Sequence, residues 1–240
     1  MKKFLILIFI YTVVSKLIAQ DLTFEHITAE NGLSQSSVIC IAQDSLGFMW
    51  FGTPNGLNRY DGYDIKIYKH DVNNVYSIGE NRILSLLTDS RNILWICTLN
   101  GLNIYDHKTN RFYKIDIKSG IVNSGSKIRI STIFEAKDGT IWVGTGDLGL
   151  IKIILPKNLY NLSDNLAIHY IESYSEGNNN YTINNITDIC QNKDGNLWIT
   201  TRSGIIVFDP EREKVVKTYN NESNNSYSLS SLINKNTGKN

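Results

Sequence analysis

Short apolar runs rich in β-branched residues recur along the chain and are separated by turn-forming residues. The clearest runs predict strands at 38–42, 83–87, 130–134 and 186–190. Each is followed by a glycine or asparagine, the residues that tolerate positive φ, and then by a second apolar run that contains a tryptophan. Turn signals roughly every 8–12 residues indicate short antiparallel strands and exclude a helical interpretation.

Four copies of one pattern account for most of the chain. The tryptophans recur every 45 to 56 residues, and the first turn of each copy keeps a glycine or asparagine at one place. These positions are Trp50, Trp95, Trp142 and Trp198, and Gly47, Asn92, Gly139 and Gly195. A repeat of this length and content is typical of propeller blades. We therefore predict an all-β fold, a β-propeller of four-stranded antiparallel blades, with about four blades in residues 21–219. We expect this propeller to be incomplete.

Each copy is expected to use its tryptophan to pack against the neighbouring blade, because a four-stranded sheet cannot bury both faces alone. A sugar-stacking role is the alternative, and four copies at one repeat position argue against it. The residue two places after each tryptophan is small: Gly52, Cys97, Gly144 and Thr200. Three unevenly spaced cysteines form no disulfide framework and no zinc pattern. Cys97 and Cys190 are expected to fill the core, and Cys40 is less clearly buried.

The first twenty residues differ from the rest. Lys2 and Lys3 precede an uncharged apolar stretch of eleven residues, 4–14, and a small-residue neighbourhood follows at Ala19. This order predicts a secretory signal peptide at 1–20, cleaved near Ala19–Asp21. An uncleaved anchor is the alternative, but a helix needs about 20 apolar residues to span a bilayer. No membrane span is expected after the signal peptide.

The last segment, 220–240, is rich in Asn and Ser and is expected to be a polar tail or the start of a truncated fifth blade. The phrase Tyr76-Ser-Ile78 stands before the second copy, and Tyr227-Ser-Leu229 follows the fourth. A natural polar C-terminus is the alternative. Without closure two blade faces lie open, so we expect self-association or pairing with further blades.

The charge balance and the spacing of the histidines limit the classes of function that the chain can have. Lys plus Arg is 24 and Asp plus Glu is 23, which offers no electrostatic basis for binding nucleic acid. The four histidines (His26, His70, His107, His169) lack metal-ligand spacing and are expected at the surface or in linkers. We predict no catalytic constellation, metal or cofactor.

The turns between second and third strands should gather on one face, with Asn55, Asn100, Asp147, Arg202 and, nearby on the third strand, Arg59. Such groups suit an oligosaccharide ligand, or they serve the turns themselves.

Two phrases carry a family resemblance. Residues 24–38 read FEHITAENGLSQSSV, and residues 43–62 read QDSLGFMWFGTPNGLNRYDG. They resemble the start of the two-component regulator propeller family, the periplasmic sensor regions of hybrid two-component histidine kinases typical of Bacteroidetes-type bacteria. The resemblance covers residues 22 to about 230. The third copy departs from it, with one extra residue in the turn at 146–149.

The resemblance implies a periplasmic ligand sensor, and many such proteins respond to glycans. Full-length members continue into further blades, a β-sandwich, a membrane helix and kinase domains, so the chain is interpreted as an N-terminal fragment that is not itself an enzyme. Two alternatives stay open. One is a structural or protein-interaction propeller. The other is a propeller lyase or glycosidase, which would require clustered carboxylates or histidines on one face.

Overall fold

A computed structural model describes residues 24–115, 117, 128–154, 170–174, 183 and 185–220. The predicted signal peptide at 1–20 and the predicted tail at 220–240, apart from Asn220 at the end of the last strand, lie outside the described residues. Within these ranges every regular element is a strand, apart from one 3-10 turn, η1 (Ala29–Asn31). The described residues contain no helix long and apolar enough to cross a membrane. The all-β prediction is confirmed.

The strands form four sheets, and each sheet is an antiparallel blade whose four strands pair in chain order. Blade 1 contains β1 (Cys40–Gln43), β2 (Met49–Thr53), β3 (Gly56–Tyr60) and β4 (Ile65–Tyr68). Blade 2 contains β5 (Ile83–Thr88), β6 (Leu94–Thr98), β7 (Gly101–Asp106) and β8 (Arg111–Ile115). Blade 3 contains β9 (Ile130–Glu135), β10 (Ile141–Thr145), β11 (Leu150–Ile154) and β12 (Tyr170–Tyr174). Blade 4 contains β13 (Ile186–Gln191), β14 (Leu197–Thr201), β15 (Gly204–Asp209) and β16 (Lys214–Asn220).

The turn between the first and second strand of each blade depends on one residue at positive φ. Gly47, Gly139 and Gly195 have φ between 83° and 89°, and Asn92 has φ of 62°. These are the four positions that the sequence pattern singled out. Glycine adopts this conformation without a Cβ penalty, and asparagine tolerates it better than most residues. The predicted hairpins are therefore confirmed.

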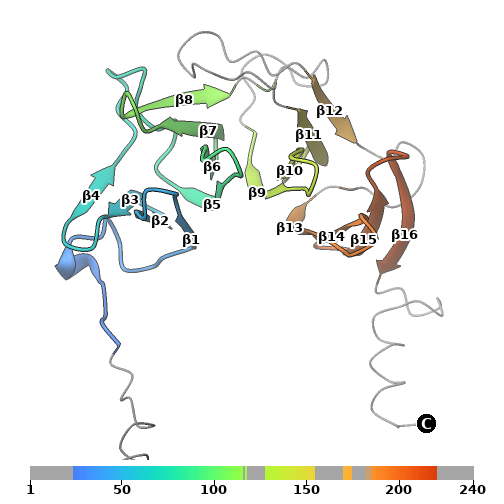
Figure 1. Ribbon diagram of the computed structural model, residues 1–240, viewed down its shortest axis with the longest axis horizontal. Helices are drawn as coiled ribbons and strands as arrows, with labels where there is room; N and C mark the ends of the chain where they lie inside the picture. The colour runs from blue at the N-terminus through green and yellow to red at the C-terminus, as the bar shows by residue number, and fades with distance from the viewer. Residues whose placement is uncertain are drawn as a thin grey trace, which may run out of the picture.

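The four blades stand side by side in an open arch (Figure 1). The first strands, β1, β5, β9 and β13, lie next to one another along the hollow of the arch. The fourth strands, β4, β8, β12 and β16, lie on its outer side. Among the described residues, blades 1 and 4 are the two ends of the arch and no sheet joins them. This is the incomplete propeller that the repeat count predicted.

Each blade uses its two faces differently. We call the face that carries the tryptophan the tryptophan face, and the opposite face, which packs on the tryptophan of the preceding blade, the receiving face. Directly paired residues of antiparallel strands share a face, so the register defines both. Three apolar clusters fill the three contacts between successive blades, and their tryptophans are Trp50, Trp95 and Trp142. These three side chains are at most 1% exposed, so the predicted packing role is confirmed.

The small residue after each tryptophan allows close approach of the next blade. A Cβ added at Gly52 would lie 2.7 Å from Cγ2 of Ile83, and one added at Gly144 would lie 2.5 Å from Cγ2 of Ile186. Real Cβ atoms do not approach neighbours so closely, and an interior packed at crystal density cannot relax freely. Glycine at these two positions therefore gives room for the isoleucine that begins the next blade and for a side chain of its own blade, Cys40 at Gly52 and Thr132 at Gly144.

Blade 4 departs from the sequence expectation because no described blade covers its tryptophan face. Trp198 is only half-buried, and Cys190, which was predicted to fill the core, is exposed. Cys97, on the tryptophan face of blade 2, is fully buried as expected. Burial raises the pKa of Cys97, and it raises the pKa of Cys40 to about 12, so neither thiol forms a thiolate readily. The prediction for Cys190 was wrong because burial of a repeat position requires a following blade.

Candidate functional site

The turns between the second and third strands are built around one threonine in each blade. The hydroxyl of Thr53, Thr98, Thr145 or Thr201 donates to the carbonyl of the glycine that begins the third strand or, in blade 3, directly precedes it, at 2.8–3.1 Å. The same oxygen accepts an amide hydrogen from inside the turn. In blade 3 the accepted amide comes from Leu148, three residues after the threonine instead of two, which accommodates the predicted insertion. The threonine hydrogen bonds fix the backbone of these turns, so the turns can hold their side chains in defined positions.

Backbone hydrogen bonds join these turns to the segments that precede the first strands. The amide of Leu99 donates to the carbonyl of Arg82 at 3.4 Å, and the amide of Gly146 donates to that of Arg129 at 3.0 Å. The carbonyl of Gly146 accepts from Asn185 at 2.8 Å, and Asn185 in turn accepts from the amide of Arg202 at 3.3 Å. Three successive hydrogen bonds thus join Arg129 of blade 3 to Arg202 of blade 4. The turn face is our name for the surface formed by the turns between the second and third strands and by the residues that directly precede the first strands.

Four of the five residues predicted for binding lie on the turn face. Asn55, Asp147 and Arg202 are exposed, and Asn100 is half-buried. The side-chain amide of Asn55 donates to the carbonyl of Ser34 at 3.2 Å, so it holds the lead-in segment of its own blade. That contact is the turn-supporting role that was the alternative for these residues. Their role in binding stays a prediction.

The fifth predicted residue, Arg59, is not with the others. Its guanidinium lies 4.4 Å from the ring centre of Phe48 and 5.9 Å from that of Trp50, on the tryptophan face of blade 1. Arg59 pairs with Trp50 across the strands, toward the opposite end of the blade from the turn at Asn55. The strand alternation separates the two side chains, so Arg59 is part of the contact between blades.

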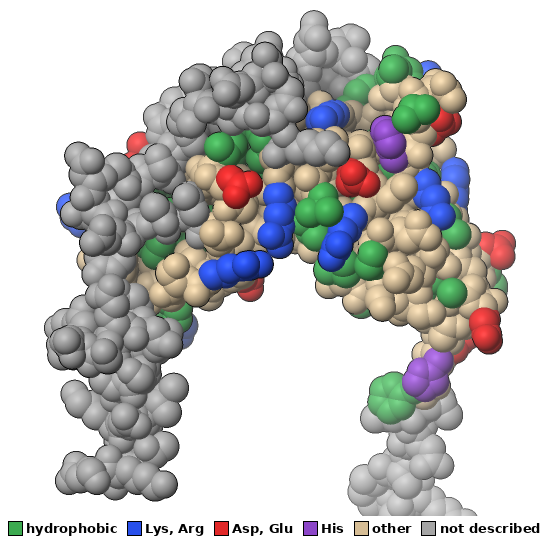
Figure 2. All heavy atoms as spheres, turned by 180° about the vertical axis from the view of Figure 1, so that it is seen from behind, with side chains coloured by type: hydrophobic (Ala, Val, Ile, Leu, Met, Phe, Trp, Pro, Cys, Tyr) green, Lys and Arg blue, Asp and Glu red, His purple; other side chains and the backbone are tan. Residues whose placement is uncertain are grey.

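Two arginines that the sequence analysis did not select also belong to the turn face. Arg82 and Arg129 occupy the same repeat position, immediately before the first strand of blades 2 and 3, and both are exposed. Within the described ranges, the side chains of Arg82, Arg129 and Arg202 make no hydrogen bond or ion pair with the protein. Figure 2 shows Lys and Arg side chains bordering the hollow of the arch. Spacing from the tryptophan was the signal that could have identified Arg82 and Arg129.

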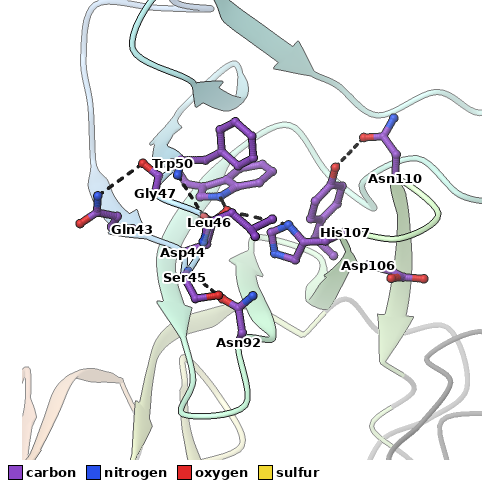
Figure 3. Close-up of polar contacts among 12 residues, drawn as sticks. Gln43, Asp44, Ser45, Leu46, Gly47, Trp50, Asn92, Asp106, His107 and Asn110 are labelled. Atoms are coloured by element: carbon purple, nitrogen blue, oxygen red, sulfur yellow. Dashed lines mark hydrogen bonds and ion pairs between the residues drawn. The ribbon is translucent and has the colours of Figure 1, made fainter.

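A second polar cluster lies between blades 1 and 2, as Figure 3 shows. The buried carboxylate of Asp44 accepts a hydrogen bond from Nε1 of Trp50 at 2.7 Å and two amide hydrogen bonds from its own turn at 3.0 Å. Nδ1 of His107 lies 3.8 Å from the same carboxylate. Burial lowers the pKa of His107, although the charge of Asp44 acts in the opposite direction.

This cluster has the character of a structural contact. The imidazole of His107 packs edge-on against Tyr105, with ring centres 5.0 Å apart. Both oxygens of Asp44 are already engaged, so the carboxylate is not available as a base for a substrate. His107 was expected at the surface or in a linker; it lies in the β7–β8 turn, but its side chain is only 16% exposed because it contacts Trp50 and Tyr105 between the blades. Across the part of the chain that the structure describes, no three His, Cys, Asp or Glu side chains are placed to hold a metal ion.

The fold and the turn face together define an open β-propeller with one polar, partly basic rim. Three segments, 32–55, 124–147 and 180–203, match the family model described as two component regulator propeller. They contain the first two strands of blades 1, 3 and 4. These three segments are therefore similar to two-component regulator propeller repeats, in agreement with the resemblance.

Similar proteins agree with this assignment. Histidine kinase P4 of Formosa agariphila is 47% identical over 58 residues, which is 24% of this chain and 4% of that protein. An extracellular domain from B. thetaiotaomicron, described as belonging to a hybrid two component system, is 25% identical with a TM-score of 0.64. That comparison covers 82% of this chain and 27% of the other, so the chain spans about a quarter of its solved relative.

A propeller enzyme is also similar in shape. Virginiamycin B lyase from Staphylococcus aureus has a TM-score of 0.54 and 14% identity, over 82% of this chain and 59% of that one. An identity this low shows a shared fold alone, because propellers serve many functions.

Proposed function

We propose that the chain forms the periplasmic, ligand-sensing propeller part of a two-component sensor. The regulator propeller repeats support this, and so do the relatives, which are a histidine kinase and an extracellular domain. Export through the predicted signal peptide at 1–20 belongs to the same proposal. Signal transmission would require the other parts of a longer sensor, since the chain spans about a quarter of its solved relative.

We propose further that the turn face binds an oligosaccharide. The observation that carries this is the set of exposed or half-buried polar side chains on turns that are each held by the hydroxyl of one threonine. Asn100, Asp147 and Arg202 offer amide, carboxylate and guanidinium groups, which form directed hydrogen bonds with hydroxyl-rich ligands. A ligand that crosses from blade 3 to blade 4 would contact Arg129 and Arg202 together, because three hydrogen bonds join their backbones.

Calorimetric titration of the full chain with a panel of neutral and acidic oligosaccharides tests this proposal. A double variant, Arg129→Ala with Arg202→Ala, is expected to weaken binding roughly 100- to 10,000-fold, since each of the two lost bonds to a charged donor is worth about 1.5–3 kcal/mol. Arg91→Ala is the matched control, because Arg91 is exposed on the β5–β6 turn at the other end of its blade. Affinity that is unchanged in the double variant, or equally reduced in the control, would remove the turn face as the binding surface.

A further inference from the structure

The two ends of the arch present opposite halves of one contact. Blade 4 shows a tryptophan face with Cys190, Trp198, Val207 and Lys217 in one cross-strand row and Asp188, Thr200, Ile205 and Tyr219 in the next. Blade 1 shows a receiving face with the row Ile41, Phe51, Asn58 and Ile67. Ile41 and Ile67 are 57% and 42% exposed, whereas the corresponding Ile189 of blade 4 is 4% exposed under Trp142. We propose that the first blade of a second copy of this chain covers the tryptophan face of blade 4, head to tail.

The three contacts inside the arch show what a receiving face accepts. In every one a tryptophan face of the preceding blade covers it, and each contact is apolar at its centre. The free receiving face of blade 1 therefore fits a tryptophan face, and the described tryptophan face without a partner is that of blade 4. A head-to-tail contact would repeat an interface that the chain already forms three times.

Side-chain size agrees with this pairing. Ile83 packs against Gly52, and Ile186 packs against Gly144. At the same repeat positions the free ends carry Val38 on blade 1 and Thr200 on blade 4. In the proposed contact Val38, which is smaller than isoleucine, would face Thr200, which is larger than glycine. The summed side-chain volume at this position is therefore partly preserved. Val38 is 37% exposed, in contrast to the buried Ile83 and Ile186.

A polar contact repeated between blades also has its two halves at the ends of the arch. The amide of Ser90 donates to Oε2 of Glu135 in the next blade at 2.8 Å, and the amide of Lys137 donates to Oε1 of Gln191 at 3.0 Å. The equivalent donor in blade 4 is the amide of Lys193, and the equivalent acceptor in blade 1 is Gln43.

Gln43 is already oriented for this contact. Its Nε2 donates to the carbonyl of Gly47 at 3.4 Å, as Nε2 of Gln191 donates to that of Gly195 at 2.8 Å. That bond leaves Oε1 available, and Oε1 is the atom through which Gln191 accepts from the preceding blade. Within the described ranges neither Oε1 of Gln43 nor the amide of Lys193 has a hydrogen-bond partner, and a second copy would supply one for each.

Both ends of the arch lie on the same side of the molecule (Figure 1). Two copies that meet at both ends would therefore close into a ring with two identical contacts. We expect the full chain to sediment with the mass of two chains at micromolar concentration. Labelling of the exposed Cys190 thiol should slow as protein concentration rises through the dissociation constant, because the second copy covers it.

Two single variants and their mixture test the direction of the contact. Ile41→Asp blocks the receiving face and Thr200→Arg blocks the tryptophan face, so each variant alone should be monomeric, with association weakened about 100-fold or more. An equimolar mixture keeps one intact face on each partner and should form a one-to-one dimer. Val72→Asp is the control, since Val72 is 82% exposed between β4 and β5 and should leave the assembly unchanged.

The polar contact has its own pair of variants. Gln43→Ala should weaken association roughly 4- to 100-fold, because one hydrogen bond, usually worth about 2- to 10-fold, is lost at each of the two contacts. Gln43→Glu should retain it, because Glu135 makes the same contact inside the arch. A monomeric full chain at all concentrations would overturn the proposal. So would a mixture that stays monomeric while circular dichroism shows both variants folded, or a dimer that survives Thr200→Arg.

Discussion

Replacement of Asp44 is the sharpest test of how the first turn supports a blade. The carboxylate accepts the indole hydrogen of Trp50 at 2.7 Å and the amides of Leu46 and Phe48 at 3.0 Å each. Three hydrogen bonds to an ionised acceptor, at about 1.5–3 kcal/mol each, give an upper limit of about 5–9 kcal/mol. Turn amides regain water when the acceptor is removed, and effects within one turn are not additive. We therefore expect Asp44→Ala to lower the free energy of unfolding by about 3–5 kcal/mol.

The substitution Asp44→Asn separates the two parts of this effect. The side-chain oxygen of asparagine can still accept from the two turn amides. Its NH2 group takes the place of the oxygen that accepts from the indole and cannot accept a hydrogen bond, so about 1.5–3 kcal/mol of stability should be lost. Asp138→Ala is the control, because Asp138 is exposed and accepts a single amide, from Thr140 at 3.0 Å. It should change stability by less than about 1 kcal/mol.

Chemical denaturation followed by tryptophan fluorescence and circular dichroism measures all three variants. For a chain of this size, 1 kcal/mol corresponds to about 2–4 °C in the melting temperature, so Asp44→Ala should melt roughly 6–20 °C below the parent. The reasoning fails if Asp44→Ala loses no more stability than Asp138→Ala. Equal losses in Asp44→Ala and Asp44→Asn would show that the turn amides contribute nothing.

Two further predictions concern the contacts between blades. Gly144→Ala should lower the free energy of unfolding by about 1–3 kcal/mol, because the new Cβ overlaps Ile186 and Thr132. Replacing Ile186 by alanine removes the clashing Cγ2, so the losses from Gly144→Ala and Ile186→Ala should be less than additive in denaturation experiments, and additive losses would contradict the steric explanation. For His107, the folded pKa lies below the unfolded value of about 6.5, so the unfolded state binds more protons in that window and stability should fall as pH drops through about 6.5. His107→Gln should show a smaller stability loss between pH 7 and 5.5, and an unchanged pH profile would contradict the assignment.

The sequence was sufficient to predict the blade itself. Strand alternation, a positive-φ residue in the first turn and the spacing of the tryptophans are all local or periodic signals, and each predicted hairpin is present. The small residues Gly52 and Gly144 were also identified by their place in the repeat, and the structure shows the isoleucines that require them. The turn face could be located as well, because strand order places the four turns at one end of their blades.

Errors arose where a side chain's surroundings depend on a neighbouring blade. Arg59 is close in sequence to Asn55, but strand alternation directs it onto Phe48, between blades. His107 was expected at the surface or in a linker, yet its side chain is mostly buried, 3.8 Å from the carboxylate of Asp44 in the neighbouring blade. Arg82 and Arg129 were overlooked although both stand at the same spacing before their tryptophans, and the assembled arch brings them to the same face as Arg202.

Cys97 and Cys190 show most clearly what the sequence determined and what it left to the tertiary structure. Both lie on strongly β-forming strands of the same repeat, and the sequence alone specified those strands, their turns and their tryptophans. Yet Cys97 is fully buried and Cys190 is exposed. Blade formation depends on contacts within some forty residues, whereas burial of a blade face depends on whether another sheet stacks upon it. Only the arrangement of the blades in space decided which copies of the repeat have that partner.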